Sequence, residues 1–134
     1  YGQFKRLKEL LNIKRKIFKE YKKGLSKINV HFNIDNKNLK NGLWATVVNF
    51  DKKYKINIPR LIKFLKQKKV YSREFFRPLS SQPGYKNFTS NKIAKQNKIS
   101  YSLFKNTLVL PSHYNLNKYD IQKVCSYIIK FINI

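Results

Sequence analysis

The N-terminal segment, residues 3–24, carries the longest amphipathic pattern in the chain. Its apolar side chains recur at three- and four-residue steps, and lysines, arginines and glutamates separate them. This spacing predicts one long helix with a single apolar face, roughly 33 Å in length. Because such a face is stable only when it is covered, packing against a second layer is favoured over binding of a separate partner. Gly24 marks the expected end of the helix.

Three later segments are rich in β-branched and aromatic residues and therefore predict short strands. They are residues 42–50 (GLWATVVNF), residues 70–76 (VYSREFF) and residues 107–110 (TLVL), which Pro111 follows. Residues 30–42 are polar and rich in Asn, so they predict a loop.

Helical patterns lie between and after the predicted strands. Asn57 has the position of an N-cap for the helix after the first strand, and residues 91–104 form a second amphipathic stretch. Asn117 and Asp120 resemble the capping box of a terminal helix, with Asp in place of the preferred Glu. Cys125 lies on the apolar face of that helix, where it is expected to be a small core residue and not a nucleophile.

The order of these segments predicts the fold class. A long helix is followed by three strands that alternate with helices, which indicates an α/β or α+β layer packing. At 134 residues the chain has the length of one domain and can bury a modest core, so residues 1–134 are expected to form a single domain.

The net charge of +24 suggests a polyanionic partner, so a small basic nucleic-acid-binding protein is one hypothesis for the function. However, 25 of the 30 basic residues are Lys, and they are spread along the chain in ones and twos. Specific readout of bases or phosphates favours Arg, and no aromatic and arginine signature of an RNA-binding sheet is present. A generic solvated surface is therefore the favoured interpretation of the charge.

Targeting signals are not visible in the sequence. No run of about 18 apolar residues predicts a membrane span, and no signal peptide opens the chain. Cys125 is the single cysteine, which excludes an internal disulfide and a cysteine-based zinc site and fits a reducing, cytoplasmic setting. Since the chain begins with Tyr1 and contains no Met, we expect it to be an excerpt of a longer product.

Catalytic and metal-binding constellations are not evident either. His31 and His113 are far apart in sequence and have no carboxylate or cysteine at a ligand spacing. The six acidic residues show no paired arrangement for acid–base chemistry, and four glycines cannot build a phosphate-binding loop. We therefore predict no catalytic, cofactor-binding or metal-binding residue in this chain.

Two stretches carry a resemblance to a known family. The sequence SREFFRPLSSQPGY and the later NTLVLPSHYNLNKYDIQKVCSYI are similar to the C-terminal part of the DegT/DnrJ/StrS-type aminotransferases. KRKIFKEYKKGL, residues 14–25, looks like the helix that opens the small domain of this family, and Trp44 matches the aromatic residue of its first strand. The matching positions in the two stretches are Arg73, Phe75, Phe76, Pro78, Leu79, Tyr85, Leu110, Pro111, Ser112, Leu116, Asp120, Ile121 and Val124.

This resemblance implies the C-terminal small domain of a fold-type I aminotransferase, with an antiparallel sheet of about three strands and helices packed on it. The family uses pyridoxal phosphate (PLP) to transfer an amino group to nucleotide-linked keto sugars. It places the Schiff-base lysine and most cofactor contacts in a large domain, for which residues 1–134 have no counterpart. The chain is then expected to be inactive alone, to need the large domain or a subunit that carries it, and to form a homodimer in the complete enzyme.

The resemblance also implies substrate-binding residues at a rigid turn. Arg73 would end a strand before Pro78, and the turn would present Ser80 and Ser81 toward the nucleotide sugar, with Tyr85 beyond them. The guanidinium of Arg73 could hold a carboxylate or phosphate through two parallel hydrogen bonds. Ser80 stands where the family usually has a histidine near the sugar, which places substrate handling at this position in doubt.

A structural alternative applies to the same stretch. Arg73 could pair with Glu74 or with an acid of the large domain, while Phe75 and Phe76 fill the core. This alternative is favoured for Arg73 and for both phenylalanines.

Overall fold

A four-stranded antiparallel sheet forms the centre of the computed structural model, which describes all residues except 35, 37, 40, 89–92, 94–95 and 134. The strand order is β1 (Val30–Phe32), β2 (Thr46–Phe50), β4 (Thr107–Leu110) and β3 (Arg73–Glu74). The two central strands are in register from Thr46 opposite Leu110 to Asn49 opposite Thr107. The antiparallel α+β class expected from the family resemblance is confirmed, with one strand more than expected.

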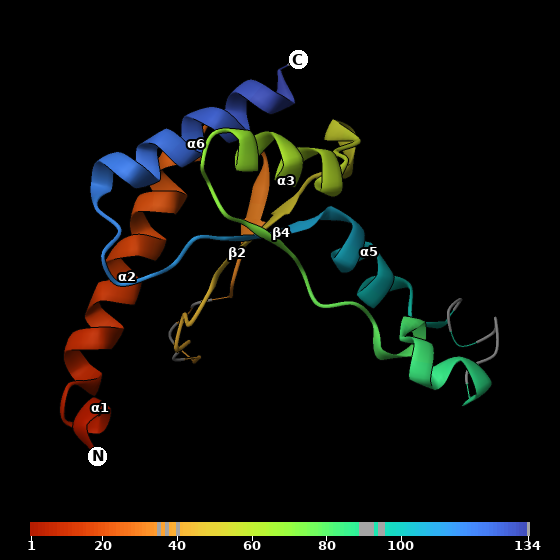
Figure 1. Ribbon diagram of the computed structural model, residues 1–134, viewed down its shortest axis with the longest axis horizontal. Helices are drawn as coiled ribbons and strands as arrows, with labels where there is room; N and C mark the ends of the chain where they lie inside the picture. Colours follow the sequence, from red (N-terminus) through yellow and green to blue (C-terminus); the bar gives the residue numbers. More distant parts are fainter. Residues whose placement is uncertain (35, 37, 40, 89–92, 94–95, 134) are drawn as a thin grey trace.

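Helices α2 (Leu7–Gly24), α3 (Ile58–Gln67) and α6 (Lys118–Ile132) bury their apolar sides together with the sheet (Figure 1). Val48, Phe50 and Leu108 of the central strands point into this core and are 0–1% exposed. Cys125 of α6 is 2% exposed, which confirms its predicted place in the core. The core also contains Ile17, Tyr21, Leu25, Ile58, Leu61, Leu65, Leu110, Ile121, Val124 and Ile128.

Side-chain caps begin two of these helices at the predicted residues. Asn57 Oδ1 accepts a hydrogen bond from the backbone N–H of Arg60 at 2.9 Å and thereby caps α3. At the start of α6, Asn117 accepts from the N–H of Asp120, and the carboxylate of Asp120 accepts from the N–H of Asn117. The reciprocal pair confirms the capping box, and Asp serves in place of Glu.

The remaining elements are short. They are α1 (Gly2–Lys5), η1 (Lys52–Tyr54), η2 (Leu79–Ser81), η3 (Pro83–Phe88) and α5 (Lys98–Asn106). The last three belong to an arm, comprising residues 75–88 and 96–106, that extends from the sheet toward the end of the molecule opposite α1 (Figure 1). The arm therefore carries the Pro-Leu turn away from the helices that cover the core.

The first helix differs from its prediction because the segment expected as one helix over residues 3–24 is divided at Arg6. Arg6 has φ −97° and ψ 5°, and its N–H bonds to Gln3 O instead of continuing the α-helical pattern. No side chain of α1 is buried, so no packing holds this turn in line with α2.

Several strand boundaries also differ from the sequence expectation. Residues 30–32, predicted as loop, form β1 because Val30 and Phe32 pair with β2 and pack on the core. The strand predicted from residue 42 begins only at Thr46, after Leu43 turns the chain with φ 47°. The strand predicted over residues 70–76 is limited to Arg73–Glu74. The helix predicted over residues 91–104 is described as α5 from Lys98 onward, and most of its first four residues lie outside the described part.

Candidate functional site

The Leu-Pro-Ser motif at the end of β4 is an anchor, because its hydrogen bonds join β4 to β2 and α2. Ser112 Oγ accepts the N–H of Thr46 at 2.9 Å and donates to Leu110 O at 3.1 Å. The hydroxyl of Tyr21 donates to Pro111 O at 3.0 Å, and burial raises the pKa of this phenol. The motif that resembles the family therefore fixes helix α2 and strand β2 against the end of β4.

Lys14 strengthens the same anchor. Its ammonium donates to the backbone oxygens of Trp44, at 3.2 Å, and Ser112, and it lies 4.6 Å from the ring centre of Tyr114. Burial lowers the pKa of Lys14. No sequence pattern marks this role, because Lys14 differs from the other lysines only in its tertiary surroundings.

A pocket of about 600 Å³ opens beside this anchor, and it is called the basic pocket below. Its walls come from the α3–β3 connection (residues 68–73), the end of β4 with the loop after it (residues 109–113 and Leu116), and α6 (Asp120, Lys123 and Val124). Trp44 and Ala45 line it as well. Arg73, one of the four predicted substrate residues, lines this pocket, whereas Ser80, Ser81 and Tyr85 do not.

The three other predicted residues lie on the arm. Ser80 Oγ and the hydroxyl of Tyr101 are 3.1 Å apart, which ties η2 to α5, and Ser81 Oγ donates to Pro78 O at 2.7 Å. Tyr85 is 49% exposed, and its N–H bonds to Gln82 O at 3.0 Å. The structure thus groups these three residues on one turn region and places Arg73 at the edge of the sheet.

Within the described residues, the structural alternative for this stretch is wrong about Glu74 and about Phe76, while pairing of Arg73 with an acid of a large domain stays a prediction. Glu74 accepts from Arg77 at 3.3 Å and is not paired with Arg73. Phe76 is 65% exposed and does not fill the core; its ring centre lies 6.2 Å from that of Trp44 and 5.5 Å from that of Phe75. Phe75 is half-buried. An exposed aromatic cluster of Trp44, Phe75 and Phe76 therefore adjoins Arg73.

Comparison with known proteins identifies the family. A sequence profile described as the DegT/DnrJ/EryC1/StrS aminotransferase family matches residues 1–129. The chain belongs to this family. No curated protein matches it at a significant level.

Solved structures of aminotransferases share the fold of this family member at low sequence identity. A Streptococcus pneumoniae protein described as a sugar aminotransferase, Spr1654, superposes with TM-score 0.86 at 17% identity, over 98% of this chain and 33% of its own. DesI, solved with its TDP-sugar product, gives TM-score 0.84 at 17% identity, over 96% and 33%. Helicobacter pylori PseC, described as an aminotransferase of pseudoaminic acid biosynthesis, gives 0.80 at 16%, over 98% and 35%. The chain spans about one third of the length of these relatives.

PLP, the cofactor that the family implies, does not fit the described residues of this chain by themselves. A PLP site needs a lysine that can attack the cofactor and an acid for its ring nitrogen. Among the described lysines, Lys14 is the one whose pKa is lowered by burial, but two backbone oxygens already hold its amine. Asp120 at the basic pocket is bound in the capping box.

The described residues contain neither a cluster of metal ligands nor a membrane-spanning helix. No three His, Cys, Asp or Glu side chains there lie close enough together to hold a metal ion. None of the helices that the structure describes is long and apolar enough to span a membrane.

Proposed function

We propose that this chain is the C-terminal portion of a PLP-dependent nucleotide-sugar aminotransferase and is inactive alone. One observation carries the proposal: the family match extends over residues 1–129, while the solved aminotransferases are about three times as long as the matched region. The complete enzyme would move an amino group from an amino acid to a keto sugar nucleotide, for amino-sugar or surface-polysaccharide synthesis. DesI and PseC support this class of substrate, because a TDP-sugar product and pseudoaminic acid biosynthesis are named for them.

The substrate would contact Arg73, Ser80, Ser81 and Tyr85. Arg73 is exposed at the edge of the sheet and has no ion pair among the described residues, so its guanidinium can bind an anionic group of the substrate. The η2 turn holds Ser80 and Ser81 in fixed positions through hydrogen bonds to Tyr101 and Pro78. A hydroxyl at position 80 can orient a sugar hydroxyl, but it cannot replace a histidine in proton transfer at neutral pH.

Residues 1–134 would act as one domain, and a large domain outside them would bind PLP. Trp44 and Phe76 of the exposed aromatic cluster, respectively 64% and 65% exposed, provide an apolar surface that fits such a partner. The large domain is the expected occupant because two thirds of each solved relative lies outside the matched region. The complete enzyme would be a homodimer, and the buried free thiol of Cys125 suits a reducing compartment such as the cytoplasm.

Charge alone supports the nucleic-acid-binding hypothesis, and the family match favours the aminotransferase. At about 150 mM salt, long-range attraction between exposed charges is largely screened. We expect a generic DNA duplex not to bind the chain under that condition. Binding that persists there and falls steeply with added salt would instead support the nucleic-acid hypothesis.

The coding region upstream of Tyr1 provides the direct test. We expect it to encode a large domain with a lysine in a strand-loop context. Co-expressed with this chain, that domain should aminate a keto sugar nucleotide with glutamate as donor, whereas the chain alone should neither do so nor change the spectrum of added PLP.

Arg73→Gln should reduce the activity of the complex far more than Arg60→Gln, because Arg60 is exposed on α3 away from the basic pocket. An active isolated chain, or a complex without activity on any keto sugar nucleotide, would contradict the proposal.

A further inference from the structure

The pairing between β2 and β4 stops where the chain enters and leaves the sheet. Thr46 opposite Leu110 is the last pair of the ladder at this end. The same register would place Trp44 opposite Ser112, but there the N–H of Thr46 donates to Ser112 Oγ at 2.9 Å instead of to the opposite backbone. Pro111 has no N–H with which to extend the ladder. The backbone oxygens of Trp44 and Ser112 therefore need a donor from outside the sheet.

Lys14 of α2 is that donor. Its ammonium donates to Trp44 O at 3.2 Å and to Ser112 O, so one side chain joins the two segments beyond the end of the ladder. Because burial lowers the pKa of Lys14, its charge is kept at a cost that an exposed lysine does not have. The two oxygens and the ring of Tyr114 offset that cost, since each favours a cation. A charge held in this way fixes the oxygens that hold it.

Trp44 is the large side chain whose backbone Lys14 holds. Its neighbours Leu43 and Ala45 are buried, and Leu43 turns the chain with φ 47°, whereas the indole of Trp44 is 64% exposed. The indole lies 6.2 Å from the ring of Phe76 and belongs to the exposed aromatic cluster. An exposed ring on a turn loses conformational freedom when a partner covers it, which weakens binding about twofold to tenfold. A contact that orders Trp44 beforehand removes this loss.

Lys14 reaches Trp44 from the side of α2. Trp44 and Ser112 line the basic pocket and Lys14 does not; it lines a separate cavity of about 420 Å³ together with Leu10 and Leu11 of the same helix. The ammonium contacts the backbone of Trp44 and not its ring, so the indole surface is left open to a partner. Lys14 therefore acts on the exposed cluster through Trp44.

We propose that Lys14 is a positioning residue that holds the backbone at Trp44 and so orients the indole before the large domain docks on it. Tryptophan is among the residues that contribute most to protein interfaces, so ordering it in advance strengthens association. The identity of the partner rests on the proposed function. The ordering of Trp44 is a property of the isolated chain, so it can be measured without the large domain, PLP or amino transfer.

Backbone ¹⁵N relaxation of the isolated chain tests the ordering. We expect the amide of Trp44 to have an order parameter of about 0.85, as rigid backbone does, and to fall below about 0.6 in Lys14→Met, which keeps an unbranched side chain but loses the charge and the donors. Lys14→Arg retains donors and should stay near the parent value. Lys19→Met removes an exposed charge from the same helix and should leave Trp44 unchanged.

Order parameters describe the folded state, so a general loss of stability would not lower that of Trp44 alone. The amide of Val48, in the middle of β2, should therefore keep its order parameter in all variants. A Trp44 that is already mobile in the parent chain, or that is equally rigid in Lys14→Met, would overturn the proposal.

A double-variant cycle tests whether the ordering serves docking. Calorimetric titration of the separately expressed large domain with the chain measures the affinity. Lys14→Met should weaken binding about tenfold, and Trp44→Ala at least about thirtyfold. When Trp44→Ala is already present, adding Lys14→Met should change the affinity by less than about twofold, because Lys14 acts through Trp44. Lys19→Met should stay within about twofold of the parent chain.

The outcomes separate this inference from the proposed function. An equal effect of Lys14→Met with and without Trp44 would show that Lys14 contacts the partner directly, which would overturn the positioning role. Normal binding by Lys14→Met would overturn it as well, while the proposed function stood. A parent chain that does not bind the large domain would contradict the proposed function and the docking role together, although the order parameter of Trp44 would still report on the Lys14 contact.

Discussion

The contact between Gly24 and Cys125 offers a direct test of how α2 packs on α6. A Cβ added at Gly24 would lie 2.6 Å from the Sγ of Cys125 and 3.1 Å from its Cβ. Non-bonded carbon and sulfur atoms do not approach so closely, and Gly24 and Cys125 belong to two helices that pack on each other. We therefore expect Gly24→Ala to destabilise the fold although alanine favours helix.

The two effects can be compared in magnitude. Overpacking a core costs about 1–3 kcal/mol, whereas Gly to Ala within a helix returns at most about 1 kcal/mol, and less at a helix end. Gly24 is the last residue of α2, so the expected net loss is about 1–2 kcal/mol in the free energy of unfolding. Cys125→Ala should cost about 1 kcal/mol through lost apolar burial. In the double variant the sulfur that the new Cβ would meet is absent. The free energy of unfolding should therefore fall by less than the sum of the falls in the two single variants.

Urea denaturation followed by circular dichroism measures all four proteins of this cycle. The coupling between the two sites should be about 1 kcal/mol, as expected for residues in contact. Gly84→Ala is a matched control, because a Cβ there would meet nothing within 4 Å, and its stability should change by less than about 0.5 kcal/mol. Gly24→Ala with unchanged stability, or losses that simply add in the double variant, would refute the close packing of α2 on α6.

Three further perturbations test the anchor, the capping box and the buried thiol. Tyr21→Phe removes the hydroxyl that donates to Pro111 O and should cost about 1 kcal/mol in urea denaturation; a stability equal to the parent would show that this bond contributes nothing. Asn117→Ala should cost about 1 kcal/mol through loss of the cap, and Asn117→Asp, which keeps an acceptor oxygen, should retain most of the stability. Burial raises the pKa of Cys125 to about 12 in the folded chain, above its ordinary value of 9.0. The neutral thiol therefore contributes stability that is fully present below pH 9.0 and declines as the pH rises toward about 12. The parent chain should lose more stability than Cys125→Ala across that interval, and parallel pH profiles would contradict this account.

Local interactions explain which parts of the fold could be predicted. The caps at Asn57 and Asn117 join residues only three positions apart, so their chemistry is visible in the sequence. Cys125 could be assigned to the core from the spacing of its helix alone. By contrast, the three residues of β1 form a strand only because β2 pairs with them, and polar neighbours hide that pairing.

The candidate site depends on contacts that no local pattern encodes. The Lys14 ammonium meets Ser112 O across 98 positions of sequence, and nothing distinguishes this lysine before the chain folds. The basic pocket joins residues near positions 44, 70, 110 and 123, which lie in four separate segments. The family resemblance led to Arg73, but only the structure shows that Arg73 and Lys123 line the same pocket while Ser80 and Ser81 lie on the arm.

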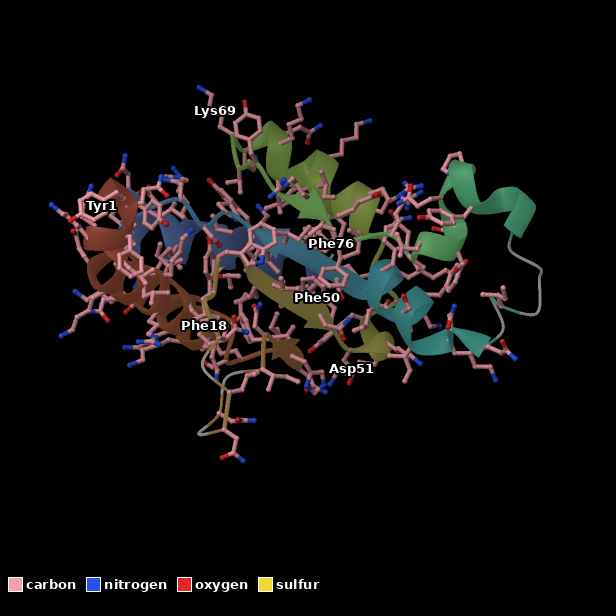
Figure 2. The ribbon with its side chains drawn as sticks, turned by 90° about the horizontal axis from the view of Figure 1, so that it is seen from below. Tyr1, Phe18, Phe50, Asp51, Lys69 and Phe76 are labelled. Carbon is pink, nitrogen blue, oxygen red and sulfur yellow. The ribbon has the colours of Figure 1, made fainter. Side chains whose placement is uncertain are left out.

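The placement of the acids gives the charge of +24 a physical interpretation. Among the described residues, four acids have structural partners: Glu9 pairs with Arg6, Glu74 with Arg77, and Asp51 and Asp120 cap the starts of helices. Side-chain nitrogens instead project outward along much of the outline of the described residues (Figure 2). These four acids thus lie where a backbone N–H or an arginine binds them, whereas most lysines of the described residues are exposed to water. A composition of this kind raises the net charge without building a site, so charge is informative only where cations converge on a cavity, as Arg73 and Lys123 do.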